Sequence, residues 1–307
     1  MNETVPEIAK SFSFEVILPA PLDPATSLEM FRRNGDDLLD RWDGITFRRT
    51  LPVEGRFVPF ICTFKGDLFN PVACVTITNP EDRPAVEEGV KNTFVASPPD
   101  FEKLLAVDPI LARLEMLYPG VRQVRQPDLL TCLVRCISAQ QVNLRWAAVT
   151  RRRLAEAYGD IYTLPDGETV YSLNAEKLAG ATVASIRQLQ FTTRKAEYII
   201  GCSEAIASGA LSGPELEALP DEGVINRLTA LRGIGVWTAE WVLARGLGRP
   251  TVVAGDLGVR KAVGMAYLNE PLPPESSVRQ ATAHWGHAGS AAQALLLHGL
   301  ANNTLTC

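Results

Sequence analysis

A chain of 307 residues with 46% hydrophobic and 21% charged residues is long enough for one large core or two to three smaller ones. It has no run of about 18 uncharged apolar residues, and its first ten residues lack the basic and apolar stretches of a secretory signal. We therefore expect a soluble, cytoplasmic protein without a membrane span. The formal net charge of −5 argues mildly against nucleic acid as a partner, because phosphate binding needs local positive potential.

The first hundred residues show the alternating, β-branched and aromatic patterns of β-strands. Four such runs begin at Ser11, Ile45, Arg56 and Pro71. Because turn residues separate the last three runs, these predict an antiparallel meander.

A helix is expected between the first two strands. Asp23 followed by Pro24 predicts its N-cap and its first position. The apolar face of this helix would carry Leu28, Phe31 and Leu38. Residues 1–98 are therefore interpreted as a small α+β domain built on an antiparallel sheet.

From Ser97 onward the pattern changes to one helix after another. One apolar face is formed by Leu130, Leu133, Val134 and Ile137, and the next by Val142, Trp146, Val149 and Leu154. Residues 99–307 are therefore expected to be a mostly α-helical region in two lobes. The chain as a whole is assigned to the α+β class.

Arginines are concentrated at the start of this helical region. Between residues 122 and 153 there is a single acid, Asp128, beside Arg122, Arg125, Arg135, Arg145, Arg151, Arg152 and Arg153. Such an excess predicts a positive face on an acidic protein, although a solvated helix face explains Arg151 to Arg153 equally well. Nucleic acid therefore stays among the possible partners.

No metal site is predicted. Cys132 and Cys136 lie four residues apart in an apolar helical pattern, which favours buried helix positions over a pair of metal ligands. His284 and His287 have no nearby cysteine or carboxylate to complete a coordination set.

The most informative segment is residues 226–264. Gly233 and Gly235 allow a sharp turn between two helices, and Ile234 between them can plug the space that the helices enclose. The second helix would present free N–H groups at its N-terminus, where a phosphate is favoured; these belong to Gly235, Val236 and Trp237. A tight helix–helix turn without a ligand is the alternative.

A carboxylate follows this hairpin in the chain. Asp256 stands directly before an apolar helical pattern that includes Val259 and Val263. By itself, an aspartate in this place is typical of an ordinary helix N-cap.

Together the two segments resemble the helix-hairpin-helix (HhH-GPD) DNA glycosylase superfamily, and within it the AlkA-type 3-methyladenine DNA glycosylase II branch. The hairpin reads Leu231-Arg232-Gly233-Ile234-Gly235-Val236-Trp237-Thr238-Ala239, and the acidic segment reads Asp256-Leu257-Gly258-Val259-Arg260-Lys261. The resemblance implies a monomeric base excision repair enzyme. Such an enzyme binds damaged double-stranded DNA, flips a base out of the stack and hydrolyses its glycosidic bond.

The resemblance also implies roles for single residues. Asp256 would stabilise the oxocarbenium-like sugar and activate water. Trp237, Trp241 and Trp285 would line the pocket for an alkylated purine of the 3-methyladenine or 7-methylguanine type, whose positive charge suits aromatic faces. For Trp241, a hydrophobic core position is an equally good interpretation.

The remaining expected contacts are with the DNA itself. The hairpin residues Gly233, Ile234, Gly235, Val236, Trp237 and Thr238 would grip the backbone without reading sequence. Gln140 and Gln141 would fill the gap left by the flipped base, unless they merely cap the ends of helices. No cofactor is implied, apart from a monovalent cation at the hairpin that bridges to a DNA phosphate.

Two alternatives compete with this interpretation. A bifunctional 8-oxoguanine-type glycosylase and lyase shares the fold, but it needs a lysine where this chain has Trp237. A catalytically silent helix-hairpin-helix module would keep Gly233 and Gly235 and would need no acid at Asp256.

Overall fold

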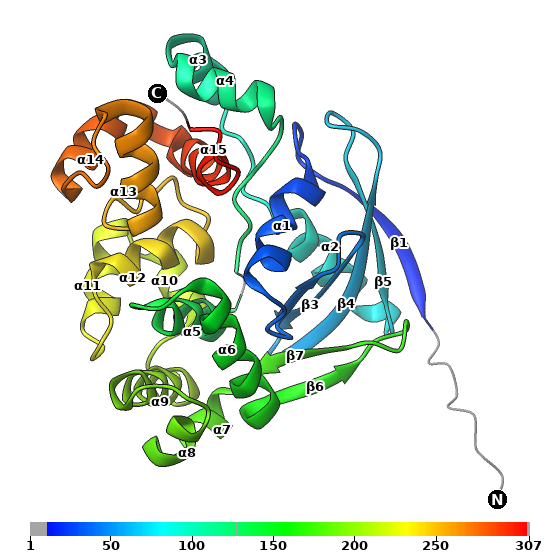
Figure 1. Ribbon diagram of the computed structural model, residues 1–307. Coiled ribbons are helices and arrows are strands. Elements are labelled where there is room, and N and C mark those ends of the chain that lie inside the picture. Colours follow the sequence, from blue (N-terminus) through cyan, green and yellow to red (C-terminus); the bar gives the residue numbers. More distant parts are fainter. Residues whose placement is uncertain (1–10, 127, 306–307) are drawn as a thin grey trace, which may run out of the picture.

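The computed structural model describes residues 11–126 and 128–305. The first part of the chain forms a five-stranded antiparallel sheet in the order β1-β5-β4-β3-β2 (Figure 1). Its strands are β1 (Phe12–Ile17), β2 (Asp40–Trp42), β3 (Thr46–Val53), β4 (Arg56–Lys65) and β5 (Val72–Ile77). The predicted meander is confirmed as β3, β4 and β5, and the short strand β2 was not predicted.

Helix α1 (Pro24–Asn34) joins β1 to β2, and the carboxylate of Asp23 caps it by accepting a hydrogen bond from the Thr26 N–H at 3.0 Å. Its Leu28 and Phe31 enter the core of the sheet domain. The expected extension to Leu38 is wrong, because the N–H of Gly35 bonds back to the last turn and the chain leaves the helix there. Helix α2 (Arg83–Lys91) contributes Val86 and Val90 to the same core.

The rest of the chain is mostly helical, which confirms the α+β class. The helices are α3 (Phe101–Val107), α4 (Pro109–Leu117), α5 (Leu129–Ala139), α6 (Leu144–Tyr158), α7 (Ala175–Ala179), α8 (Val183–Gln188), α9 (Thr193–Ala207), α10 (Gly213–Ala218), α11 (Asp221–Thr229), α12 (Val236–Trp241), α13 (Leu257–Val263), α14 (Glu275–Thr282) and α15 (Gly289–Ala301). Two separate apolar cores divide them into two lobes. One core lies among α5 to α12, and the other lies among α3, α4 and α13 to α15.

Helix α6 buries a different face from the one that was predicted. Val142 precedes the helix, and Trp146 and Val149 are 38% and 40% exposed. Leu154 is buried as predicted, but its buried neighbours on the helix include Ala147 and Ala148. Small side chains are needed on the buried side because α6 lies close to the sheet domain. A Cβ atom placed on Gly35 would lie only 3.5 Å from the Cβ atom of Ala148.

A two-stranded hairpin within the helical region was also not predicted. Strands β6 (Gly159–Thr163) and β7 (Thr169–Leu173) pair antiparallel, and Val170 packs with Ile61 of the main sheet. The N–H of Tyr171 donates to the carbonyl of Leu38 at 2.8 Å. The hairpin therefore ties the helical region to the sheet domain (Figure 1).

The segment after α4 returns to the sheet domain. Phe94 forms a β-bridge with Val124, and both side chains belong to the sheet domain's core. Helices α3 and α4 are thus an excursion from that domain towards the C-terminal lobe. The division at residue 98 stays a prediction. None of the helices in the described ranges is both long and apolar enough to cross a membrane.

Buried ion pairs hold α5 and α6 against the loop that precedes β2. The Asp37 carboxylate lies 2.7 Å from the Arg135 guanidinium and 2.8 Å from that of Arg151. Asp40 pairs with Arg135 at 2.7 Å and also with Arg49. Burial alone would raise the pKa of Asp37, but the two guanidinium groups outweigh burial and lower it.

Substitution Asp37→Asn is expected to lower the free energy of unfolding by about 3–5 kcal/mol, since it removes the acidic partner of the buried Arg151 and leaves Arg135 with Asp40 alone. Urea unfolding measures the loss. Because the pKa of Asp37 is lower in the folded state, its contribution is present above the pKa of the unfolded carboxyl and disappears as the pH falls through the folded pKa.

The matched control is Glu156→Gln, which breaks the exposed pair between Arg152 and Glu156 on α6. It should change the free energy of unfolding by no more than about 0.5 kcal/mol. Equal effects of the two substitutions would show that the buried pairs do not hold the domains together.

Candidate active site

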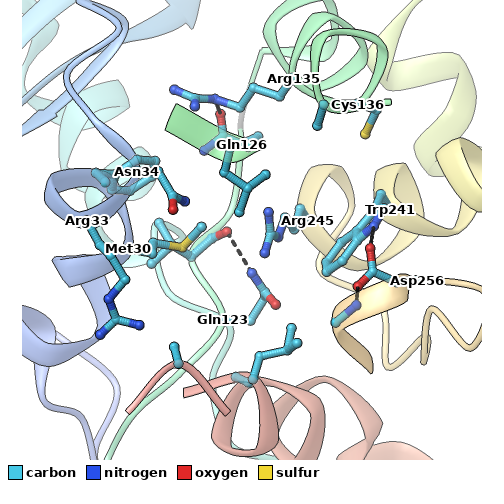
Figure 2. A pocket seen from close by; sticks show the side chains of 18 of the residues that line it. Met30, Arg33, Asn34, Gln123, Gln126, Arg135, Cys136, Trp241, Arg245 and Asp256 are labelled. Atoms are coloured by element: carbon cyan, nitrogen blue, oxygen red, sulfur yellow. Dashed lines mark hydrogen bonds between the residues drawn. The ribbon is translucent and has the colours of Figure 1, made fainter. Parts of the chain in front are cut away.

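A cavity of about 1110 Å³ opens where the sheet domain meets the two helical lobes. One wall comes from α1 and from the segment that follows α4, with Met30, Asn34 and Gln123. The opposite wall carries Trp241 and Asp256, and α15 closes a third side (Figure 2). Segments far apart in sequence therefore build a single pocket.

Asp256 is both a helix cap and a cavity residue. Its Oδ1 accepts hydrogen bonds from the N–H groups of Gly258 at 2.8 Å and Val259 at 3.1 Å, at the start of α13. Its Oδ2 accepts from the indole Nε1–H of Trp237 at 3.1 Å and of Trp241 at 3.3 Å. Four donors from two elements thus fix the carboxylate in one orientation. Figure 2 shows the bond from Trp241 to Asp256.

The two tryptophans lie one turn apart on α12. Both line the cavity, and both direct the indole N–H to Asp256. Trp241 also packs against Cys136, Ala244 and Val253. Pocket lining and core packing, which the sequence left as alternatives, are therefore combined in Trp241.

Trp285 does not line the cavity, and its assignment to the base pocket is corrected. It is 2% exposed and lies in the core of the C-terminal lobe. Its ring stands 6.0 Å from that of Tyr267 and 6.2 Å from that of His284. The 3₁₀ turn Ala283–Ala288 before α15 directs this side chain inward.

Sequence reasoning missed Arg245, which also lines the cavity. It lies in a π-helical turn, Val242–Gly246, that continues α12, and its guanidinium carbon is 4.0 Å from the centre of the Trp241 ring. The signal was present, since Arg245 follows Trp241 by four residues and therefore falls on the same side of a helix. The wall from α1 had no such signal in the sequence.

The helical hairpin has the predicted form. Gly233 has φ of +85°, and Ile234 is 4% exposed in the core beneath the turn. A Cβ on Gly233 would stand 2.2 Å from the ring of Tyr198, whereas a Cβ on Gly235 would meet no atom within 4 Å. No side chain caps the N-terminus of α12, where Gly235 and Val236 are exposed.

Thr238 differs from these two hairpin residues, because its side chain is buried. Any contact it makes with a partner outside the hairpin would have to come from its backbone.

Gln140 and Gln141 line the cavity and directly follow α5. Gln141 is exposed and has a φ of +56°, a backbone conformation that residues other than glycine rarely adopt. Within the described ranges, neither side-chain amide forms a hydrogen bond with another residue. The glutamines therefore do not cap helix ends through their side chains.

The arginine-rich stretch is only partly a positive face. Arg122 pairs with Glu115, Arg135 and Arg151 pair with Asp37, and the Arg125 guanidinium donates to the carbonyl of Gly246 at 2.9 Å. Arg145 and Arg152 are left exposed on α6, and Arg153 is half-buried and lies over the ring of Trp146. Helix periodicity could not predict the burial of Arg135 and Arg151, because their acidic partner Asp37 comes from a distant segment.

The thiols of Cys132 and Cys136 are buried on α5, as predicted, and both line the cavity. A hydrogen bond with Cys132 and then burial raise the pKa of Cys136. Over the described part of the chain, no three histidine, cysteine or acidic side chains gather as metal ligands would.

A family model described as HhH-GPD superfamily base excision DNA repair protein matches residues 134–287. A Bacillus subtilis protein, YfjP, whose name assigns it to the DNA-3-methyladenine glycosylases, is 33% identical over 173 residues, which are 55% of this chain and 58% of the relative. The chain thus spans little more than half the length of that relative.

Two solved structures share the fold. The 3-methyladenine DNA glycosylase from Archaeoglobus fulgidus has a TM-score of 0.82 at 22% identity, with 93% of this chain and 98% of that chain covered. The 8-oxoguanine glycosylase/lyase from Clostridium acetobutylicum in complex with double-stranded DNA has a TM-score of 0.72 at 18% identity, with 92% and 93% covered.

The two hairpin glycines are expected to respond differently to the same change. Gly233→Ala should lower the free energy of unfolding by about 2–4 kcal/mol, because alanine is strained at this positive φ and its Cβ clashes with the ring of Tyr198. Gly235→Ala should change it by less than about 0.5 kcal/mol, since the added methyl group meets open space. Urea unfolding compares the variants, and equal losses would refute the difference.

Proposed function

The chain belongs to the HhH-GPD superfamily of base excision DNA repair proteins, and on this basis we propose that it is a monofunctional DNA glycosylase acting on alkylated purines. The observation that carries the proposal is Asp256, whose carboxylate faces the cavity and is fixed by four hydrogen-bond donors. A plain N-cap would not need the two indole groups. A silent DNA-binding module would need neither the carboxylate nor the cavity.

The substrate would be a base turned out of the DNA stack. A glycosylase cannot reach the glycosidic bond inside the duplex, so the nucleotide must rotate into a pocket at a cost of a few kcal/mol. The cavity beside Asp256 is large enough for a purine nucleoside, since pockets for such ligands span about 300–1,000 Å³. Gln140 and Gln141, which line it, are proposed to fill the gap in the duplex.

Asp256 would act on the sugar of the flipped nucleotide. As the base departs, the sugar develops oxocarbenium-like charge, and a fixed carboxylate beside it lowers the barrier. The same carboxylate orients and deprotonates the water that attacks the sugar. The four donors hold it ready for both steps, so that little reorganisation is needed during the reaction.

The cavity favours hydrolysis without strand cleavage. A lyase reaction requires an amine that forms a Schiff base with the sugar. Of the described residues that line the cavity, none is a lysine. The family resemblance implies that Trp237 stands at the hairpin position where lyases carry their lysine. This counts against the bifunctional 8-oxoguanine-type alternative, whose fold is shared.

Alkylated purines are proposed as the substrates on the strength of the relatives' names. Both the Bacillus subtilis relative and the Archaeoglobus fulgidus structure are named for 3-methyladenine. A methylated purine carries a positive charge, which makes it a good leaving group. Trp237 supplies an aromatic surface within the pocket.

The hairpin is proposed to bind the DNA backbone. The exposed N-terminus of α12 offers N–H groups at Gly235 and Val236, and no side chain of the protein caps it. Since phosphates are the same in every sequence, this contact fixes the position of the duplex without reading bases.

Asp256→Asn is expected to reduce base release at least about 10³-fold, because the amide cannot stabilise the developing charge. The measurement is release of free base from methylated duplex DNA, with the strands run on a gel before and after alkali. Nicks that appear only after alkali would identify a monofunctional enzyme.

The control for this experiment is Asp23→Asn, which changes the N-cap of α1 in the same way, outside the cavity lining. Its base release should stay within about threefold of the wild type. Wild-type release by the Asp256 variant would exclude Asp256 as the catalytic carboxylate, and duplex binding by that variant would show that it is folded.

Gly235→Leu is expected to weaken duplex binding by about tenfold or more, equally for every sequence, because the side chain blocks approach to a phosphate. Fluorescence anisotropy with several undamaged duplexes measures it. Since no atom lies near this position, the free energy of unfolding should hardly change. A loss that depended on sequence would contradict a contact with the backbone.

A further inference from the structure

The segment that leads into Asp256, residues 251–255, forms neither helix nor strand. It ends in a turn, in which the N–H of Asp256 donates to the carbonyl of Val253 at 2.9 Å. Gly255 lies inside this turn, and glycine restricts the backbone less than any other residue. Four donors orient the Asp256 carboxylate. The place of its main chain also depends on what holds the turn.

The first residue of the turn is held by a side chain from α15. The main-chain N–H of Val253 donates to Oε1 of Gln293 at 2.7 Å. Val253 is fully buried, and Gln293 is 1% exposed. Because solvent reaches neither residue, the Val253 N–H would be left without an acceptor if the amide were absent.

The Gln293 amide has no second role among the described residues. Its Nε2 is buried and has no hydrogen-bond partner there. A buried amide costs free energy unless its polar atoms are bonded, and an apolar side chain of similar size would fill the space without that cost. What the amide contributes at this place is therefore the bond to Val253.

Two further contacts bring α15 close to the same stretch of main chain. The Ser290 hydroxyl donates to the carbonyl of Arg249 at 2.6 Å. A Cβ atom placed on Gly289 would lie 2.6 Å from the carbonyl oxygen of Pro250, so the helix approaches the chain closely there. The first turn of α15 thus holds the start of this stretch, and Gln293, one turn further along the helix, holds its end.

We infer that Gln293 is a positioning residue for the reaction, which places Asp256 through the turn that begins at Val253. The inference rests on the proposed glycosylase function and adds to it a residue that lies outside the cavity lining. Misplacement of a reacting group by about 1 Å can cost about 10²-fold in rate. A buried side chain that touches no DNA can therefore control how well the carboxylate works.

Gln293→Met tests the inference, because methionine has a similar length but no strong acceptor in the place of Oε1. Single-turnover release of 7-methylguanine from methylated duplex DNA should fall about 10- to 100-fold. Binding of the same duplex, measured by fluorescence anisotropy, should stay within about twofold of the wild type, since the hairpin proposed to grip the backbone lies in the other lobe.

The matched control is Leu114→Val on α4, which removes one methylene group from the apolar core of the same lobe. Leu114 lies beside Gly299, near the other end of α15. This variant should lower the free energy of unfolding, yet its release rate should stay within about threefold of the wild type.

Three outcomes would overturn the inference. Equal falls of the rate in the Gln293 and Leu114 variants would show that Gln293 merely supports the lobe. An unchanged rate in the Gln293 variant would show that it does not position Asp256. A loss of duplex binding as large as the fall in rate would place its effect in binding and not in the reaction.

A second measurement does not depend on base release. Trp237 and Trp241, two of the five tryptophans, donate their indole N–H groups to Asp256. In proton–nitrogen correlation NMR spectra, Gln293→Met should shift both indole signals, as Asp256→Asn does, and leave that of Trp146 on α6 in place.

The indole signals also separate this inference from the proposed function. Absence of base release by the wild type would refute the glycosylase proposal and leave the NMR comparison intact. Unmoved signals of Trp237 and Trp241 in the Gln293 variant, or equal shifts in the Leu114 variant, would refute the link between Gln293 and Asp256.

Discussion

The arrangement of this molecule depends on the hydrogen bonds that converge on the Asp256 carboxylate. One oxygen is held by the first turn of α13, in the C-terminal lobe, and the other by the indole groups of α12, in the hairpin lobe. The two lobes have separate apolar cores, so this carboxylate is a polar connection between units that pack independently. A single side chain thereby links the hairpin proposed to bind DNA to the proposed point of chemistry. Misplacement of the hairpin would also misplace the carboxylate.

The sheet domain is part of the site rather than an appendage. Its helix α1 supplies Met30, Arg33 and Asn34 to the cavity, opposite the tryptophans (Figure 2). What keeps this wall in place is the set of buried pairs between Asp37, Asp40 and the arginines of α5 and α6, together with the β6–β7 hairpin. Buried ion pairs add little net stability compared with apolar packing, but their directional contacts specify one arrangement of the domains. Some arginines of the arginine-rich stretch therefore hold the walls of the pocket together and are not available to bind phosphate.

Local patterns predicted what local chemistry determines. The turn at Gly233 and the cap at Asp256 follow from short-range rules, since positive φ and an N-cap each need particular residues at a particular place. Partners far apart in sequence could not be predicted. The sequence did not distinguish Trp285 from Trp237 and Trp241, yet the turn before α15 directs its side chain into the core of the C-terminal lobe. The exposed face of α6 was mistaken for a buried one because the close approach of α1 selects alanines, which carry little hydrophobic signal. The β6–β7 hairpin was missed although Asp166 and Gly167 supply turn residues between its strands.

Trp241 explains how a carboxylate and a guanidinium coexist in one pocket without neutralising each other. An aromatic ring system has a positive edge and a negative face. The indole edge donates to Asp256, while the face receives the Arg245 guanidinium at 4.0 Å. Each charge thus meets the part of the ring that attracts it, and the ring lies between them. With the indole between them, the two charged groups form no direct ion pair with each other, and both remain part of the cavity lining.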